Sequence, residues 1–187
     1  MMIASVVVAI GMTEIAGGWG KMVRTPAQVN FDWLHLGWTI YILLLAVQYW
    51  IGMWSYNQLE ISYVGQIYFL VIPTIFLVIA AYAITPDVPL EGKFDVRDYY
   101  LGNRIGVFLS LAMFSVAAWI ADLAIAGLQR LEIEFMIMSL LVASGMVALT
   151  FTKKMWVHTG VFGLSMLIVL GGLFTEMSYH DSRWLTP

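Results

Sequence analysis

Residues 3–20, IASVVVAIGMTEIAGGWG, form an apolar run that contains a single carboxylate, Glu14. Gly11, Glu14, Gly18 and Lys21 are spaced three or four residues apart, so a helix places them on one face. Glycines on that face let a neighbouring helix come close, and the acid then points at that helix rather than at lipid. A charged side chain in the bilayer costs roughly 2.5–3.5 kcal/mol, so Glu14 needs a partner, a proton or water.

The composition of the whole chain is that of a membrane protein. Of its 187 residues, 61% are hydrophobic and only 11% are charged, whereas a soluble domain carries about 25% charged residues. Apolar runs recur throughout, so we expect residues 1–187 to form a single transmembrane helical-bundle domain. The net charge of −3 includes no basic run, which argues against nucleic-acid binding. The absence of cysteine excludes disulfides, thiolate metal sites and thiol nucleophiles.

Six segments have the length and hydrophobicity of membrane-spanning helices, for which about 20 apolar residues suffice. They cover residues 3–20, 33–54, 62–84, 104–128, 133–152 and 156–175. No Lys or Arg precedes the first segment and no signal-peptidase pattern follows it, so we expect it to be retained as the first helix. The sequence therefore predicts an all-α, polytopic integral membrane protein with six transmembrane helices.

Local features mark the ends and the middle of these helices. Asp32 is suited to cap the second helix, whose tryptophans predict an aromatic belt at each membrane interface. They are Trp33 and Trp38 at one end and Trp50 and Trp54 at the other. Pro73 lies inside the third segment, where a spanning helix tolerates proline. Residues 95–100, DVRDYY, mix charges with two tyrosines and predict a short helix at the membrane surface.

Positive charges are divided unequally between the two sides of the membrane. One side has Lys21, Arg24, Lys93, Arg97, Arg104, Lys153 and Lys154. The other side has Arg130 and Arg183. Because positively charged loops stay in the cytoplasm, we expect both termini on the non-cytoplasmic side of a cell inner membrane.

Three spans per half would give helices 1–3 and 4–6 opposite orientations in the membrane. Two inverted three-helix halves are therefore a further hypothesis.

The polar residues within the helices fall into two layers. At a rise of 1.5 Å per residue, Glu14 lies about 10 Å from Lys21, in the cytoplasmic half. The cytoplasmic layer contains Glu14, His35, Arg104 and His158. The outer layer contains Gln48, Asp122 and Glu176. Apolar residues separate the layers, and we expect the four cytoplasmic-side residues to meet.

Acidic side chains inside a membrane mark paths for protons or cations. We therefore expect a small channel or transporter for a cation or protons that uses Glu14 and Asp122, with Gln48 and Arg104 beside the path. Structural roles stay open as well. Glu14 can pair with a cation to set the helix register, Asp122 can reach water at an interface, and Arg104 can anchor its helix in the headgroups.

His35 and His158, at similar depth on two helices, support a second interpretation. Two imidazoles are the axial ligands of a bis-histidine haem. A redox or pigment-associated subunit that binds haem or quinone is therefore an alternative, although nothing in the sequence requires a cofactor. A pH-sensing role suits the two histidines equally.

A third interpretation is a non-catalytic scaffolding subunit of a larger membrane complex. The chain lacks a phosphate-binding loop, a zinc-protease motif and a serine-hydrolase motif, so we do not expect a known type of enzyme. The partners we expect are the lipid bilayer and either further copies of the chain or other subunits, because a bundle this small encloses little space.

The visible absorption spectrum of the purified protein tests the haem alternative. A bis-histidine haem would give strong visible bands, and His35→Ala and His158→Ala would each remove them because each takes away an axial ligand. A colourless preparation would reject haem, but not a bound quinone.

Overall fold

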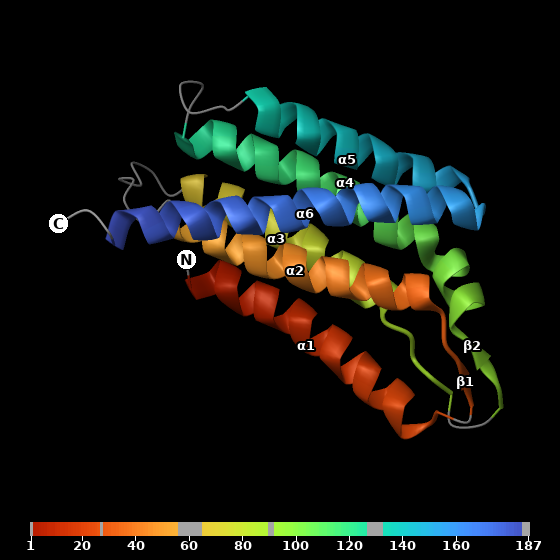
Figure 1. The fold of residues 1–187 in the computed structure, drawn as a ribbon. Coiled ribbons are helices and arrows are strands. Elements are labelled where there is room, and N and C mark those ends of the chain that lie inside the picture. Colours follow the sequence, from red (N-terminus) through yellow and green to blue (C-terminus); the bar gives the residue numbers. More distant parts are fainter. Residues whose placement is uncertain (1, 27, 56–64, 90–91, 127–132, 185–187) are drawn as a thin grey trace.

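The computed structural model describes residues 2–26, 28–55, 65–89, 92–126 and 133–184 (Figure 1). These residues form six α-helices: α1 Met2–Arg24, α2 Trp33–Ser55, α3 Gly65–Ile84, α4 Val96–Ala126, α5 Ile133–Phe151 and α6 Met155–Trp184. Two short strands, β1 Val29–Asn30 and β2 Phe94–Asp95, precede α2 and α4. The predicted all-α, polytopic fold is confirmed.

The six helices lie side by side in two layers. One layer is a row in the order α1, α3, α4, α5, in which each helix packs on the next. The other layer consists of α2 and α6, which contact each other and lie in front of that row (Figure 1). The first turn of α1 and the last turn of α6 lie at the same end of the bundle, opposite the two strands (Figure 1).

Five of the described helices are long and apolar enough to cross a membrane: α1, α2, α3, α4 and α6. The remaining helix, α5, has 19 residues, and its apolar part over Met136–Phe151 is shorter than that of the others. It runs alongside α4 (Figure 1), so it lies at the same depth as the helices that are long enough to span.

The α1–α3 contact is made by the glycine face predicted from residues 3–20. The buried positions of α1 are Ala4, Val8, Gly11, Ile15, Gly18 and Met22. A Cβ atom on Gly11 would lie 3.3 Å from Val78 of α3, and one on Gly18 would lie 2.3 Å from the Thr85 methyl group. The backbones therefore approach closely because these residues have no side chain.

The α2–α6 contact also places small residues against large ones. Gly37 of α2 accommodates the ring of Phe162, since a Cβ there would lie 2.7 Å from that ring. Gly172 of α6 lies against the amide of Gln48, since a Cβ atom on Gly172 would lie 2.3 Å from Gln48 Nε2. Between these two points, the side chains of the buried residues Tyr41 and Ser165 lie close together.

The helix α3 continues through Pro73, and hydroxyl groups bind two carbonyls next to the one that Pro73 leaves without a donor. Pro73 has no N–H to donate to the carbonyl four residues earlier. Next to that position, the Tyr49 hydroxyl of α2 donates to the Leu70 carbonyl at 3.0 Å, and Thr74 donates to the Val71 carbonyl at 2.6 Å. This is how a spanning helix tolerates proline in its interior.

Some helix boundaries differ from the prediction. The helix α4 begins at Val96 rather than at residue 104, so the segment 95–100 is not a separate surface helix but the start of α4. The helix α6 extends to Trp184 rather than ending at residue 175. Polar residues continue both helices beyond the apolar runs that predicted them. Residues 62–64 and 127–128 of the predicted segments lie outside the described residues.

The tryptophans of α2 do not all lie at the membrane surface. Trp33 is exposed, but Trp38 is completely buried. The Trp38 ring contacts Tyr41, Phe108 and Phe162 edge-on, with centroid distances of 5.3, 4.9 and 5.3 Å. Trp38 is therefore part of the core between α2, α4 and α6 rather than of an interfacial belt. Trp54 lies outside the residues whose side chains are described.

The helix pairings do not repeat between the two halves of the chain. In the first half α1 packs closely on α3, whereas in the second half α4 packs on α5 and α6 packs mainly on α2. An inverted repeat would match the α1–α3 pair with an α4–α6 pair. The arrangement of the helices thus gives no support to the hypothesis of inverted halves.

Substitutions at two glycines of α1 test the close α1–α3 contact. Gly18→Ala forces the α1 and α3 backbones apart at Thr85, and we expect it to cost about 1–3 kcal/mol of stability, as overpacking does. Gly17→Ala is the matched control, because nothing lies within 4 Å of an added Cβ there. The midpoint of thermal unfolding in detergent measures both. Equal midpoints for the two variants would contradict the contact.

Candidate functional site

The two strands lie at one end of the bundle, which we call the polar end. They join the segments that precede α2 and α4. They pair in parallel, with Val29 opposite Phe94 and Asn30 opposite Asp95. The Asn30 side-chain amide donates to the Asp95 carboxylate at 2.7 Å. The same carboxylate accepts the backbone N–H groups of Arg97 and Asp98. Asp95 therefore caps α4, which explains why this helix begins before its apolar run.

Asp32 joins the starts of α2 and α4. One carboxylate oxygen accepts the backbone N–H groups of Leu34 and His35, both at 3.0 Å, so the predicted cap of the second helix is confirmed. The other oxygen accepts the Arg97 Nε–H at 2.8 Å. The Asp32 side chain is buried whereas that of Arg97 is half exposed. The ion pair thus satisfies a carboxylate that would otherwise be buried and only partly bonded.

Side chains from α2 and α4 bind the carbonyl groups at the end of α3. His35 of α2 donates from Nε2 to the Ile84 carbonyl at 2.8 Å. The Tyr99 hydroxyl lies 3.1 Å from the Ala83 carbonyl and 2.8 Å from the Thr85 carbonyl. The last carbonyls of a helix have no partner within it. The end of α3 is therefore fixed by its two neighbours.

Tyr100 lies between the two buried histidines. Its ring meets the His35 ring at a centroid distance of 6.5 Å and the His158 ring at 5.4 Å. Its hydroxyl donates to His158 Nδ1 at 2.5 Å, and His158 Nε2 donates to the Thr152 carbonyl at 3.1 Å. With Nδ1 accepting and Nε2 donating, the imidazole of His158 is the neutral tautomer that carries its proton on Nε2.

Arg104 is close enough to His158 for its charge to act on the imidazole. Its Nη1 donates to the Leu101 carbonyl at 2.8 Å, but its buried Nε atom has no hydrogen-bond partner among the described residues. Of the four residues expected to meet on this side, His35 and His158 therefore lie on either side of Tyr100, and Arg104 lies near His158. The fourth, Glu14, is not among them.

The surroundings of the two histidines bear on haem binding. Both Nε2 atoms bond to backbone carbonyls, and the phenol of Tyr100 contacts both rings. An iron atom between them would have to displace that phenol and break both bonds. The arrangement supports a structural role for the pair, and haem ligation stays a prediction. Among the described residues no three His, Asp or Glu side chains gather as metal ligands.

Glu14 lies at the edge of the α1–α3 contact. It is half-buried, beside the buried stripe of α1 rather than on it. No hydrogen bond or ion pair of Glu14 is found within the described part of the chain. Lys21, one of the cations nearest to it in the sequence, instead binds the Asp87 carboxylate at 2.8 Å. Glu14 thus makes no ion pair with a described residue, although Lys21 is near enough for the two charges to attract each other.

Asp122 is a second isolated carboxylate, near the other end of α4. It is half-buried and lies near Tyr49, whose hydroxyl binds α3 beside Pro73. As with Glu14, the described residues provide it with no hydrogen bond or ion pair. Gln48, the neighbour of Tyr49 in the sequence, faces Gly172 of α6, and the side chain of Glu176 lies outside the described residues.

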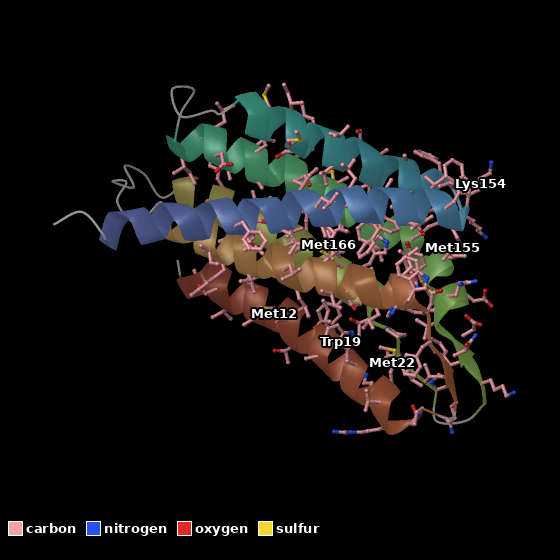
Figure 2. All side chains as sticks on the ribbon, in the orientation of Figure 1. Met12, Trp19, Met22, Lys154, Met155 and Met166 are labelled. Carbon is pink, nitrogen blue, oxygen red and sulfur yellow. The ribbon has the colours of Figure 1, made fainter. Side chains whose placement is uncertain are left out.

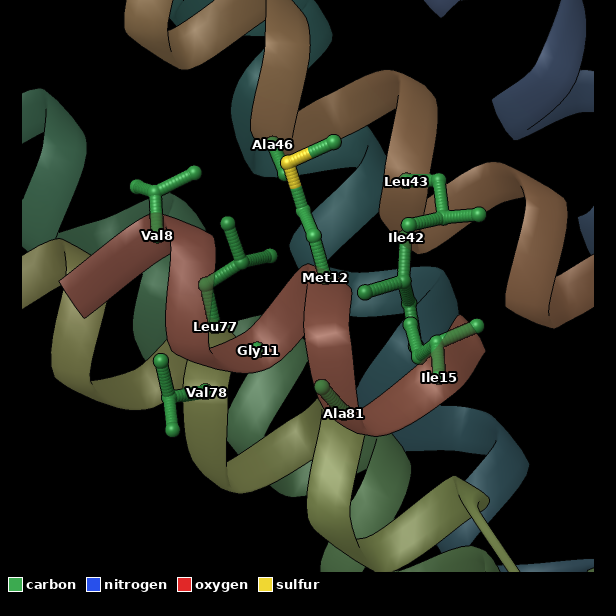
Figure 3. A pocket seen from close by; sticks show the side chains of 10 residues that line it. All are labelled: Val8, Gly11, Met12, Ile15, Ile42, Leu43, Ala46, Leu77, Val78 and Ala81. Atoms are coloured by element: carbon green, nitrogen blue, oxygen red, sulfur yellow. The ribbon is translucent and has the colours of Figure 1, made fainter. Parts of the chain in front are cut away.

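An apolar crevice separates the levels of Glu14 and Asp122. It lies between α1, α2 and α3 and is small, with a volume of about 10 Å³ (Figure 3). It is lined by Val8, Gly11, Met12, Ile15, Ile42, Leu43, Ala46, Leu77, Val78 and Ala81. Met12 extends across it towards Ala46 (Figure 3). The predicted apolar material between two polar layers is present here.

Together these features define an integral membrane protein with a hydrogen-bonded polar end and, as far as the described ranges show, two helical carboxylates that make no ion pair, Glu14 and Asp122. Comparison with protein-family models, with curated proteins and with solved structures finds no match to the chain. Its function must therefore be inferred from the residues themselves.

Sequence reasoning missed three side chains of the polar end. Arg97, Tyr99 and Tyr100 all fall within the segment 95–100, which predicted a helix lying flat on the membrane. The usable signal was the position of Asp95 directly before a helical stretch, because such a residue caps a helix. With α4 extended to that cap, Tyr100 lies one turn before Arg104 and on the same face.

Acidic pH tests the contribution of Asp95. The Asn30 side chain and the backbone N–H groups at the start of α4 hold the pKa of Asp95 below its ordinary value of 3.8. A lowered folded-state pKa means that the contribution to stability is present above pH 3.8 and is lost as the pH falls through the folded-state pKa. We expect the thermal midpoint to fall less between pH 6 and pH 3 in Asp95→Asn than in the wild type. Asp98→Asn, the control, should behave as the wild type, and a wild-type response from Asp95→Asn would refute the assignment.

Proposed function

We propose that the protein is a small channel or transporter that moves protons or another cation across a membrane, with Asp122 as the group that binds the cation. The observation that carries this proposal is the isolation of Asp122: it lies within the spanning helix α4, and no described residue binds its carboxylate. An ionised carboxylate in apolar surroundings is costly unless it takes up a proton or a cation.

The backbone near Asp122 supports the same proposal. Leu70 and Val71, in the turn before Pro73, pack together with Tyr49 and with Ile125 of the last turn of α4. The stretch of α3 before Pro73 therefore lies against the turn that follows Asp122. Pro73 leaves the Phe69 carbonyl without its helical N–H donor, and carbonyl groups freed in spanning helices bind small cations in membrane transporters. A carboxylate and such a carbonyl together would suit an ion that leaves part of its water behind.

The apolar crevice bears on how transport would occur. The crevice between α1, α2 and α3 offers an ion only aliphatic side chains and Met12. An ion that left Asp122 through this crevice would reach the polar end only if α1, α2 and α3 moved apart. This favours a mechanism in which the helices change position, rather than one with a permanently open pore.

Several further features of the proposal rest on the charge distribution. The polar end, which has most of the cations, would lie in the cytoplasm, and both termini would lie outside a cell inner membrane. The protein would act as a homo-oligomer or as a subunit of a membrane complex, because a bundle of this size encloses no wide aqueous path. Glu14 would then provide a second exchange site nearer the cytoplasm.

Ion flux into liposomes that contain the purified protein tests the proposal. Asp122→Asn keeps the size of the side chain but removes the titratable charge, so we expect flux to fall to the level of empty liposomes. Asp122→Glu should retain flux because it keeps the carboxylate. Asp98→Asn, an exposed acid at the polar end, is the control and should leave flux unchanged.

The outcomes separate the two acids. Full flux in Asp122→Asn would refute the assignment of Asp122. Loss of flux in Glu14→Gln alone would transfer the role to Glu14. A wild-type protein that conducts neither protons nor small cations in this assay would refute the proposed transport itself.

A further inference from the structure

We propose that Arg104 and the turn between α5 and α6 bind the phosphate headgroup of an anionic phospholipid. This inference does not depend on the transport proposal, because it concerns the opposite end of the bundle from Asp122. It would add a lipid-binding site to a surface that the sequence marks only as positively charged.

Arg104 has hydrogen-bonding capacity that the protein does not use. One of its nitrogens, Nη1, binds the Leu101 carbonyl, while the buried Nε atom has no partner in the described part of the chain. A buried guanidinium nitrogen without a hydrogen bond is costly. A phosphate oxygen is the acceptor that guanidinium groups bind best, through paired N–H donors.

The turn between α5 and α6 is connected to the Arg104 region of α4 by hydrogen bonds. Tyr100, one helical turn before Arg104 on the same face, binds His158 Nδ1, and His158 Nε2 donates to the Thr152 carbonyl within this turn. The Thr152 hydroxyl accepts the Lys154 backbone N–H at 3.1 Å, which shapes the turn. Lys153 and Lys154 are both exposed, and Lys154 lies at the end of the bundle where α6 begins (Figure 2).

Acidic side chains do not neutralise these cations. The two ion pairs among the described residues are Lys21 with Asp87 and Arg97 with Asp32, and neither involves Arg104, Lys153 or Lys154. The first turn of α6 adds backbone N–H groups at the positive end of a 30-residue helix. An anion would complement the charge of this site, and basic pockets at the cytoplasmic ends of spanning helices bind phospholipid headgroups.

Two aromatic side chains indicate that the anion belongs to a lipid. Phe151, at the end of α5, is 84% exposed and Trp156, in the first turn of α6, is 74% exposed. They flank the lysine pair in the sequence, and aromatic side chains lie at the headgroup level of a membrane. Beyond them, Val147 of α5 and Leu164 and Leu167 of α6 are exposed and can contact acyl chains. A free phosphate ion would make no use of this apolar surface.

Thermal unfolding of the full chain in detergent tests the site, with Trp fluorescence as the readout. Phosphatidylglycerol at ten times its Kd should raise the midpoint by roughly 3–6 °C, as expected for a ligand that binds only the folded protein. Phosphatidylcholine and inorganic phosphate should each give a much smaller shift. Lys153→Gln with Lys154→Gln, and separately Arg104→Gln, should remove at least half of the phosphatidylglycerol shift.

The matched control is the pair Arg24→Gln with Lys93→Gln, which removes the same charge from the same end of the bundle but away from the turn. It should keep the full shift. If the control pair lost as much of the phosphatidylglycerol shift as the lysine pair, the shift would reflect only general charge attraction. That result would overturn the proposal. An equal shift with phosphatidylcholine or with inorganic phosphate would overturn it as well. If Arg104→Gln does not fold, the exposed lysine pair alone decides the test.

Discussion

The polar end of this bundle is organised by the need to satisfy backbone groups at helix ends inside a membrane protein. A helix end that is covered by protein has unpaired N–H or C=O groups, and lipid offers them no partner. Here the start of α2 is capped by Asp32 and the start of α4 by Asp95. The end of α3 is bound by His35 and Tyr99. Because Asp32 also binds Arg97, the first turns of α2 and α4 cannot move independently.

The number and approximate place of the helices could be predicted because lipid selects long apolar runs. The ends could not, because Asp95 and the polar residues after Phe174 extend α4 and α6 in water, where hydropathy gives no signal. The two strands have only two residues each, too few for a periodic pattern. Three- and four-residue spacing shows which residues share a face of a helix, and Gly11 and Gly18 of the predicted face of α1 do pack on the α3 segment. Glu14 and Lys21, predicted on the same face, are not part of its buried stripe.

The level of a polar residue along the bundle could be predicted better than the side of the bundle on which it lies. His35, Arg104 and His158 lie at one level, as their positions in the sequence indicated, and they do gather. Glu14 lies at a similar level but on a different side of the bundle, which no distance along the chain reveals. Tyr100, which joins the two histidines, was missed because a tyrosine near a membrane surface is ordinarily a headgroup contact.

The lengths of the helices have a consequence for the surrounding bilayer. The helices α4 and α6 have 31 and 30 residues, which is about 45 Å at 1.5 Å per residue, while the hydrocarbon layer is about 30 Å thick. Their surplus length lies at opposite ends of the bundle, α4 beside the strands and α6 beside the first turn of α1 (Figure 1). The helix α5 has 19 residues, about 28 Å, and has no surplus. On the flank formed by α5, a bilayer thicker than about 30 Å would therefore have to become locally thinner.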